Sequence, residues 1–484
     1  MVKCLIGNQR RSNIPLEMGL PNSELICALR QFPRTASCGA VRNQKIGNVY
    51  VFRGGKKMKR NAIAGAVVSA LGLLAGSEAH AAAFALYEQG VSGLGSAYAG
   101  AAAVAEDATT VWWNPAGMAR LGSGKHFAIA GSIIAPSTKF SDSGSAPAGG
   151  QPLGGNGGDA GSTAFVPSMF FAMQYDPRWN FGVGVSVPFG LKTEYESTWI
   201  GRFQGISSKV ETLNINPSVS YNFSDAASVG FGLSYQRGKI DLLQAVSFGA
   251  LGEGQNKVNL DGDAWGFNVG ALFNVAPATR LGIHYRSSLK YNFDGNTNFS
   301  GVPAPLAASP ALQNGNVKLD LKTPDTLAFS VAHKLNDRWD LLGDLTWWHW
   351  SKIKQLPVIR TDGALSGATL STLTFNFKDT YRISAGANYK LDSAWTLKFG
   401  TAYDKTPVPS VTERSVRLPD SDRYWLSAGA KYQLSPNGVL DFGYTLVSAR
   451  NTDISNNQGA AGGNVVGTYK AHVHVLGVQY QHSF

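Results

Sequence analysis

The sequence predicts an all-β protein: a 14-stranded antiparallel transmembrane β-barrel with an N-terminal hatch, or plug, inside its lumen. Three observations predict this fold. Polar and apolar residues alternate with a period of two from Lys125 to the C-terminus, which indicates strands with one apolar and one polar face. Six short turns alternate with seven longer connections rich in Gly, Ser and Pro. A segment of small residues, 92–117, precedes the strands without alternating, as a plug would.

The N-terminal region contains a predicted signal peptide. Met58, Lys59 and Arg60 precede an apolar run at 62–75 and the small-residue cleavage motif Ala79-x-Ala81, in the order of an export signal. The run is shorter than the roughly 20 apolar residues of a membrane-spanning helix. We therefore divide the chain into an upstream extension with a misassigned start (1–57), a signal peptide (58–81), the hatch (82–123) and the barrel (124–484).

Removal of residues 1–81 changes what the composition implies. The chain carries a net charge of +11, but this segment holds twelve of its 43 Lys and Arg and three of its 32 Asp and Glu. The remainder is nearly neutral, so we expect no nucleic acid partner. All three cysteines (Cys4, Cys27 and Cys38) also precede the predicted cleavage site. We expect no disulfide, no metal and no cofactor in the exported chain.

The strand count follows from the connections. In the stretch 395–404, for example, Trp395, Leu397 and Phe399 share one face, and Thr396 and Lys398 share the other. The predicted short turns are centred at 176–178, 224–226, 276–278, 336–338, 392–393 and 435–438. The predicted long loops are near 141–162, 191–207, 243–256, 295–317, 356–372, 408–421 and 451–467. Thirteen connections join fourteen strands, with short turns on the periplasmic side and long loops outside. The terminal Phe484 closes an amphipathic strand, which predicts recognition by the barrel-assembly machinery.

Several stretches resemble a known family. The segment from Phe84 to Gly117, with its Asn-Pro-Ala motif, is similar to the hatch of the long-chain fatty-acid transporters of Gram-negative outer membranes (the FadL, OmpP1 and TodX type). Other matching stretches are VSVPFGLKTEY (185–195), WGFNVG (265–270), FKDTYRISAG (377–386) and PVP with DSDRYWLSAG (407–429). The resemblance spans the exported chain. It implies a passive outer-membrane channel for hydrophobic molecules, such as long-chain fatty acids or, alternatively, toluene-like aromatic hydrocarbons.

An apolar ligand also favours a sideways exit. Transfer of an acyl chain through water costs about 0.8 kcal/mol per CH₂, so release through a wall opening into the bilayer is the most economical route. Proline cannot donate to a β-ladder, yet Pro167, Pro188 and Pro217 fall in the second, third and fourth predicted strands. The predicted lateral opening comprises Gly182, Gly184, Pro188, Gly190 and Pro217. Prolines at strand ends remain the alternative.

The hatch is expected to act as the gate. By resemblance, Phe84 reaches into the binding pocket, and Pro115 fixes the turn that follows Asn114. The predicted gate residues are Phe84, Gly93, Gly95, Gly100, Asn114, Pro115 and Ala116. A static plug is the simpler alternative.

Polar and apolar contacts to the ligand can also be predicted. The alternation places seven charged residues in the lumen: Arg286, Lys290, Asp344, Arg382, Lys398, Asp404 and Arg423. Arg382 and Arg423 lie within the matching stretches, so we favour them as head-group contacts. Apolar residues of the third and fourth outer loops predict a capture groove: Leu243, Val246, Phe248, Leu251, Val302 and Leu306. Outer-membrane lipids and lipopolysaccharide are the expected surroundings.

Two other functions receive little support. An enzyme would need a nucleophile or an activated water with an acid–base partner, and the exported chain has no GxSxG, HExxH or P-loop pattern. His472 and His474 share a strand face, which is weak metal spacing. A general porin would lack the hatch and carry a denser set of lumen charges.

Overall fold

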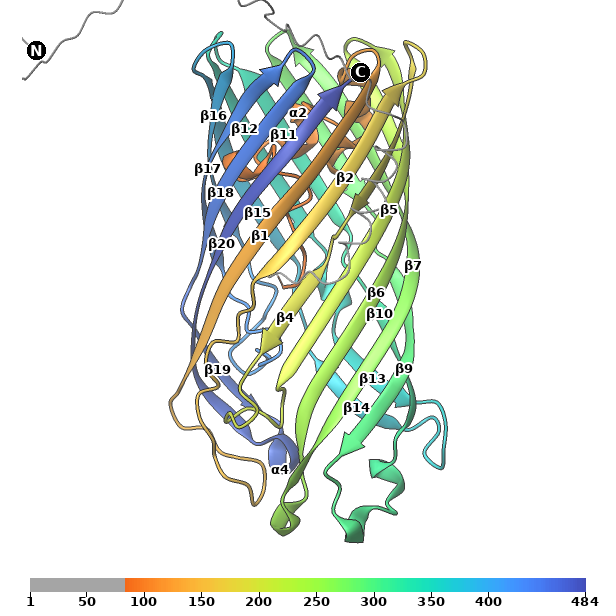
Figure 1. Ribbon diagram of the computed structural model, residues 1–484, viewed down its shortest axis with the longest axis vertical. Helices are drawn as coiled ribbons and strands as arrows, with labels where there is room; N and C mark the ends of the chain where they lie inside the picture. The colour runs from red at the N-terminus through yellow and green to blue at the C-terminus, as the bar shows by residue number, and fades with distance from the viewer. Residues whose placement is uncertain (1–82) are drawn as a thin grey trace, which may run out of the picture. The chain divides into compact units, whose positions relative to one another are not determined.

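The computed structural model describes residues 83–484. The predicted upstream extension and signal peptide lie outside the described residues. In this part of the chain, twenty strands form one antiparallel sheet, and β1 pairs with both β2 and β20. The sheet is thereby closed into a barrel (Figure 1).

The wall has fourteen segments, which confirms the predicted number. Eight segments are single strands: β1 (Lys125–Asp142), β2 (Ala164–Gln174), β5 (Ser207–Ser224), β6 (Ala227–Ser247), β7 (Glu253–Ala276), β16 (Trp395–Asp404), β17 (Arg423–Ser435) and β20 (Asn464–Ser483). Six are pairs of strands separated by a short break: β3 (Trp179–Ser186) with β4 (Gly190–Glu194), β8 (Thr279–Arg286) with β9 (Lys290–Ser300), β10 (Gly315–Lys322) with β11 (Thr326–Lys334), β12 (Trp339–Trp348) with β13 (Gln355–Arg360), β14 (Thr369–Thr374) with β15 (Thr380–Lys390), and β18 (Gly438–Ala449) with β19 (Thr452–Asn457).

All six predicted short turns separate wall segments, and they lie at the end of the barrel that is uppermost in Figure 1. The breaks within segments were not predicted, and one of them changes an assignment. Between β8 and β9, residues 287–289 shift the alternation, so that Arg286 is buried whereas Lys290 is exposed. The prediction that Lys290 points into the lumen is therefore wrong.

The N-terminal segment, residues 83–124, lies inside the upper half of the barrel (Figure 1). Its four short helices are η1 (Leu94–Ser96), α2 (Ala101–Val104), α3 (Thr110–Trp113) and η2 (Pro115–Arg120). The loops at the other end contain η3 (Gly249–Leu251), η4 (Ala304–Leu306), η5 (Pro310–Leu312) and α4 (Gly459–Gly462), whereas η6 (Trp350–Lys352) lies in the break between β12 and β13. No described helix has the length and apolar character needed to cross a bilayer.

Wall glycines allow the N-terminal segment to pack closely against the sheet. A Cβ atom on Gly400 of β16 or Gly270 of β7 would come within 3 Å of Ser96 or Asn114, respectively. A Cβ on Gly429 of β17 would meet the backbone of Gly95 in the same way. The added Cβ atom would meet backbone atoms of Ser96 and Gly95, which cannot move aside as a flexible side chain can. Even alanine in place of Gly400 or Gly429 would therefore displace the segment.

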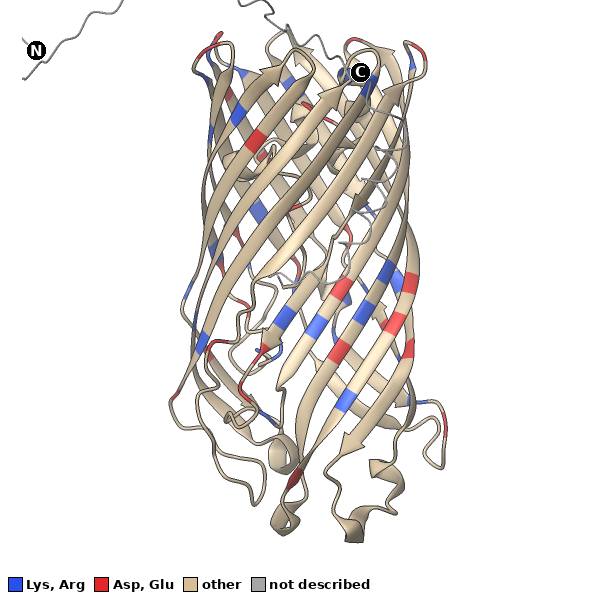
Figure 2. Ribbon diagram, in the orientation of Figure 1, with Lys and Arg blue, Asp and Glu red and all other residues tan. Residues whose placement is uncertain are grey.

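The polarity of the wall inverts along its length. On β6, Phe231 and Leu233 are exposed on the outside whereas Ser234 and Gln236 are buried inside. Beyond Gln236 the outer face carries Arg237 and Lys239 and the inner face carries Ile240 and Leu242. An aromatic pair, Tyr235 and Trp265, marks the change, with ring centroids 5.0 Å apart. Lipid-facing bands end in such aromatic girdles, so the barrel continues beyond the membrane with an apolar interior. Figure 2 shows that charged residues gather in this extension on β4 to β7.

This extension corrects two loop boundaries. β6 continues to Ser247 and β7 begins at Glu253, so the third outer loop is 248–252 and not 243–256. Leu243 and Val246 therefore lie on strand β6, whereas Phe248 and Leu251 lie in the loop. The fourth loop is 301–314 and contains Val302 and Leu306. The outward residues of a strand outside the membrane are polar, as in a loop. The predicted third loop therefore included strand residues of β6 and β7.

Candidate functional site

A cavity lies between the N-terminal segment and the inner wall. Its lining comprises Leu86, Tyr87, Tyr98, Ala101, Ala102, Trp112, Trp113, Pro188, Phe189, His284, Arg286, Ser287, Leu289, Pro324, Thr326, Ala328, Asp344, Thr346 and Trp348. Six of the nineteen lining residues are Phe, Tyr or Trp, and the free volume is about 60 Å³. That volume holds about four water molecules at ~15 Å³ each, so a larger ligand must displace lining side chains.

On the side of the cavity that faces the long loops, the lumen contains a large apolar cluster. Phe84 belongs to it, with ring centroids 5.5 Å from Phe189 and 5.1 Å from Trp350. The cluster also contains inward side chains of β6, β7, β9 and β10, including Leu260 and Leu319. It forms a continuous apolar column, because the inverted alternation turns the apolar face of these strands inward.

The wall is interrupted beside this column. Residues 164–168 of β2 pair with β1, but on their other edge no described strand pairs with them. The β2–β3 ladder ends at the pair Met169 and Val185, and β4 pairs with β5 but not with β2. A bond from Glu194 N to Ala160 O, 3.1 Å long, closes the far side. We call this interruption between β2 and β4 the window.

Residues 84–86 of the N-terminal segment cover the window from inside. Leu86 N donates to Pro188 O at 2.8 Å, and Gly190 N donates to Phe84 O at 2.9 Å. The segment thus pairs with the break between β3 and β4, where Pro188 cannot donate. Leu86 packs with Val166 and Val187 in one apolar cluster. Residues 84–86 therefore complete the wall at the break between β3 and β4, and Leu86 packs beside the unpaired edge of β2.

The predicted opening residues surround this break. Gly182 and Gly184 face inward, and a Cβ on Gly182 would meet Met118 and Val111 of the N-terminal segment, both at 2.6 Å. Pro217 lies on β5 opposite Val183 and faces outward. The ladder between β5 and β6 skips Pro217, and the side chain of Asn216 donates instead to Leu233 O at 2.9 Å.

The Asn-Pro-Ala motif fixes the N-terminal segment to the opposite wall. Asn114 Nδ2 donates to Ala102 O at 2.7 Å and to Ala271 O of β7 at 3.0 Å, while its Oδ1 accepts from Ala116 N at 3.1 Å. Asn114 is thus the N-cap of η2, and Pro115 occupies the first helical position. Gly100 has φ +73°, which suits glycine at the turn before α2. A Cβ on Gly93 would meet the Tyr98 ring at 2.7 Å.

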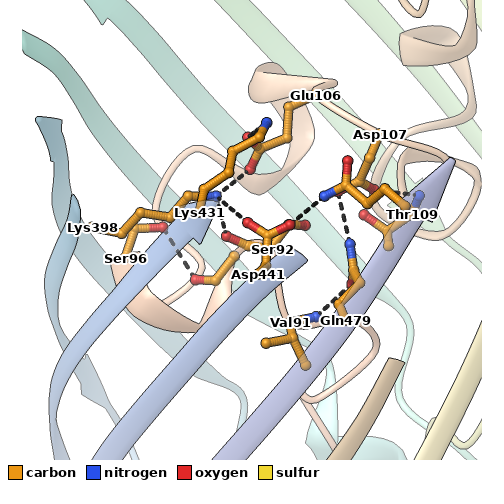
Figure 3. A network of polar contacts seen from close by, with 12 residues as sticks. Val91, Ser92, Ser96, Glu106, Asp107, Thr109, Lys398, Lys431, Asp441 and Gln479 are labelled. Carbon is orange, nitrogen blue, oxygen red and sulfur yellow. Dashed lines mark hydrogen bonds and ion pairs between the residues drawn. The ribbon is translucent and has the colours of Figure 1, made fainter. Parts of the chain in front are cut away.

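An ion-pair network attaches the other side of the segment to β16–β18 and β20 (Figure 3). Lys398 Nζ lies 2.7 Å from Glu106, 3.2 Å from Asp441 and 2.7 Å from Ser92 O. Lys431 Nζ lies 3.0 Å from the second oxygen of Glu106. Burial alone would raise the pKa of Glu106, but the attraction of the two lysines outweighs burial and lowers this pKa to about 2. Gln479 completes the network by accepting from Val91 N at 2.8 Å.

The predicted lumen cations have different partners. Arg423 forms an ion pair with Asp420. Arg382 is fully buried, lies 4.2 Å from the Tyr87 ring and 4.7 Å from the Trp425 ring, and donates to Ala97 O. Neither arginine lines the cavity, whereas Arg286 does. The alternation placed all three inside but could not tell which of them reaches the cavity.

One buried acid near the window was not predicted. The side chain of Glu88 is 2% exposed, and its Oε2 has no partner among the described residues. Burial raises the pKa of Glu88 to about 7, against smaller opposing effects of backbone hydrogen bonds and of Arg382 and Arg423. The sequence signal was a carboxylate that directly follows the apolar stretch 83–87. Residues 83–484 contain no group of three or more acidic, His or Cys side chains placed to hold a metal ion.

Comparison with known proteins agrees with this architecture. Residues 72–484 match the family model described as outer membrane protein transport protein (OMPP1/FadL/TodX). The chain belongs to this family. It is therefore an outer-membrane β-barrel of a transport family, as the sequence predicted.

Relatives and solved structures in this family include fatty-acid and toluene transporters. The long-chain fatty acid transport protein of Escherichia coli K12 is 32% identical over 387 residues, covering 72% of this chain and 84% of that protein. Outer membrane protein P1 of Haemophilus influenzae is 28% identical over 461 residues, covering 85% of this chain and 97% of that one. A FadL homologue of Pseudomonas aeruginosa has a TM-score of 0.77 at 24% identity, covering 83% and 100%. The toluene transporter TbuX of Ralstonia pickettii has a TM-score of 0.60 at 21% identity, covering 82% and 100%.

Proposed function

We propose that this protein is a passive channel for hydrophobic molecules, foremost long-chain fatty acids, that releases them sideways into the outer membrane. The window supports this proposal most directly. A closed barrel needs no gap in its ladder, yet this wall lacks pairing between β2 and β4 and uses residues 84–86 as a cover. Exposed Phe165 and Val183 flank the gap on the outer face, so its surroundings are apolar.

The apolar column supplies the route to the window. Capture by Phe248, Leu251, Val302 and Leu306 in the third and fourth outer loops would bring a ligand to the column, together with Leu243 and Val246 at the end of β6. Phe84 and Leu86 would then move away from Pro188 as the ligand enters. Gly93, Gly95, Asn114 and the rest of the segment would stay in place on the wall.

Fatty acids are favoured over aromatic hydrocarbons because one contiguous apolar cluster joins Phe84 at the window to inward side chains of β6, β7, β9 and β10. The relative with the highest identity among those above is a fatty acid transport protein, and the toluene transporters match at lower TM-scores. A toluene-like ligand by the same route is the second candidate, supported by the aromatic lining of the cavity, which includes Trp112, Trp113 and Trp348.

Two further partners belong to this proposal. The outward charges just beyond the aromatic pair, such as Arg237 and its ion-pair partner Asp261 at 3.0 Å, would lie among the phosphates of lipopolysaccharide. Phe484 is exposed at the end of β20, where the barrel-assembly machinery would recognise it.

A reversible cross-link tests the gate. Ala85 and Phe189 form an antiparallel bridge whose bonds lie on the neighbouring residues, the arrangement in which Cα atoms are about 4.5 Å apart. This distance suits a disulfide. We expect the variant Ala85→Cys with Phe189→Cys to take up radiolabelled oleate when reduced and to stop when oxidised. All native cysteines precede the predicted cleavage site, so no other pair would interfere.

The single-cysteine variants are the matched controls, since oxidation should leave their uptake unchanged. Equal uptake by the oxidised and reduced double variant, with the disulfide verified by mass spectrometry, would show that residues 84–86 need not leave the window. Toluene uptake measured in parallel separates the two ligand classes.

A further inference from the structure

Two pairs of lysines face each other across ladders on the outer surface of the barrel. Lys139 of β1 lies opposite Lys470 of β20, and Lys290 of β9 lies opposite Lys322 of β10. All four side chains are exposed. Directly opposite residues have Cβ atoms about 4.5–5.5 Å apart, and like charges in this arrangement destabilise a sheet. Each pair therefore concentrates positive charge that a bound anion would offset.

The two pairs lie on opposite sides of the barrel. β1 and β20 are the first and the last of the fourteen wall segments, whereas β9 and β10 belong to the seventh and the eighth. In Figure 1, β1 and β20 are towards the left, and β9 and β10 are towards the right. Half of the wall thus separates one pair from the other in either direction, so the pairs form two separate sites.

Neighbouring acids do not neutralise these pairs. No carboxylate of the described residues forms an ion pair with any of the four lysines. Asp159 borders Lys139, but its two oxygens accept from Ser137 Oγ at 2.6 Å and from Thr138 N at 2.7 Å. Asp320 shares the outer face of β10 with the second pair without forming an ion pair there. The positive charge of both sites is therefore available to a partner outside the chain.

A third lysine pair shows how the chain itself can supply the missing negative charge. Lys192 of β4 lies opposite Lys209 of β5. Each of these lysines has a glutamate two residues further along its own strand, with Glu194 at 3.1 Å from the first ammonium group and Glu211 at 3.0 Å from the second. Repulsion in this pair is thus relieved by acids of the same strands, and no such acid forms an ion pair with the other two pairs.

Both unpaired sites lie where the lipid-facing band ends. On β20, Lys470 lies beyond His474, whose ring nitrogen is 2.8 Å from the hydroxyl of Tyr444. On the other side, continuation of the β7–β9 register places Lys290 beside Trp265, which belongs to the aromatic pair at the outer edge of the band. Aromatic girdles mark the membrane interfaces of such barrels. The lysines are therefore at the level of the headgroups of the outer leaflet, where lipopolysaccharide carries the phosphates of its lipid A.

We infer that each of these two lysine pairs binds a phosphate group of lipid A, so that the barrel holds one lipopolysaccharide molecule on each of two opposite sides. A phosphate monoester carries between one and two negative charges at neutral pH, and lysine binds phosphate as a point charge. Two ammonium groups that share one phosphate no longer repel each other without compensation. This inference gives the lipopolysaccharide contact a defined place, and it rests on the proposed function only for the membrane around the barrel. The transported ligand has no part in it.

The number of bound lipids tests this inference. Native mass spectrometry of the purified barrel with lipid A should show two molecules bound. One molecule should remain in Lys139→Gln with Lys470→Gln, and one in Lys290→Gln with Lys322→Gln. Each lysine near an anionic lipid surface contributes ~5-fold in affinity, so loss of a pair should weaken its site ~30-fold. Lipid A without its phosphates should not occupy either site of the unaltered barrel.

Lys239→Gln with Lys318→Gln is the matched control. These two outward lysines lie opposite Asp261 and Asp294, so the same loss of charge should leave two lipids bound and change their affinity less than ~3-fold. An equal loss in the control would overturn the inference, and so would two lipids bound to both pair variants. Equally tight binding of phosphatidylglycerol or of dephosphorylated lipid A would overturn the assignment to lipid A phosphate. Heat-modifiable electrophoretic mobility reports whether each variant is folded, and oleate uptake separately tests the transport proposal.

Discussion

Removal of Lys398 should detach one side of the N-terminal segment while leaving the barrel intact. Lys398 is 3% exposed and contacts three groups at once: Glu106, Asp441 and the carbonyl of Ser92 (Figure 3). In Lys398→Met the carboxylate of Asp441, 1% exposed, retains Gln481 but no cation within ion-pair distance in the described residues. The wall itself is held by its hydrogen-bonded ladders, so the loss should be confined to the segment.

The size of the effect follows from this burial. Breaking a buried pair by removing one partner costs about 3–5 kcal/mol. Glu106 is 21% exposed and retains its ion pair with Lys431, so the lower end of this range of free energies applies. A loss of about 3 kcal/mol in local opening free energy corresponds to a ~150-fold fall in hydrogen-exchange protection. Peptides covering 91–107 should show this fall, and peptides from β6 and β7 should not.

Two further variants make the reasoning refutable. Lys398→Met combined with Asp441→Asn should regain part of the protection, because the stranded carboxylate is then neutral. Lys470→Met, on the exposed outer face of β20, should change nothing. Unchanged exchange at 91–107 in Lys398→Met would refute the assigned role of the network. Failure of Asp441→Asn to compensate would refute the attribution of the cost to a stranded charge.

Three other variants give shorter tests. Burial raises the pKa of Glu88 from 4.5 to about 7, so the folded state binds the proton more tightly than the detached segment does. Attachment of residues 84–90 to the wall should therefore weaken by about 3 kcal/mol as pH rises from 4.5 to 7. Glu88→Gln should abolish this pH dependence in hydrogen-exchange data corrected for intrinsic rates. Gly184→Trp, whose Cβ would already meet Phe170 at 2.7 Å, should fill the inner edge of the window and lower oleate uptake at least ~10-fold in a folded barrel, whereas normal uptake would exclude this edge from the route. Asn114→Ala removes two side-chain donations and the η2 cap, so protection of 110–120 should fall by about 2 kcal/mol, and no change would contradict its anchoring role.

Strand number and turn positions could be predicted because the period-two pattern persists wherever one face of the wall meets lipid. On β6 the same pattern continues past Tyr235 with its polarity reversed, and there the prediction ended the strand too early. Alternation shows which residues share a face, but not which face meets water. A break of three residues was enough to reverse the parity of Lys290 relative to Arg286.

The candidate site was predictable only in part. Pro188 and the glycines of β3 marked the interrupted segment, because proline cannot donate to a ladder. The pairing of Leu86 with Pro188 and the contact of Arg286 with Trp112 could not be predicted, since both depend on how a non-repetitive segment folds across the lumen. Sequence parity places a cation inside the barrel, but its height and its partners come from the packing of that segment.

The contacts divide the N-terminal segment into a part with many anchors on the wall and a part with few anchors, which is the part that the proposed gate would move. Residues from Val91 onward are held by Gln479, by the Lys398 network and by Asn114. Residues 84–86 are held at the window by two backbone hydrogen bonds, each contributing about 0.5–1.5 kcal/mol net, and by burial of Phe84 and Leu86. A ligand tail that takes the place of these two side chains restores the buried apolar area that their departure exposes. With a ligand present, opening the window would therefore cost little free energy beyond the two hydrogen bonds. Without a ligand, opening would also expose both side chains to water, at a cost of about 1.5–3 kcal/mol each. Under the proposed gating, the same contacts would keep an unoccupied barrel closed and allow an occupied one to open.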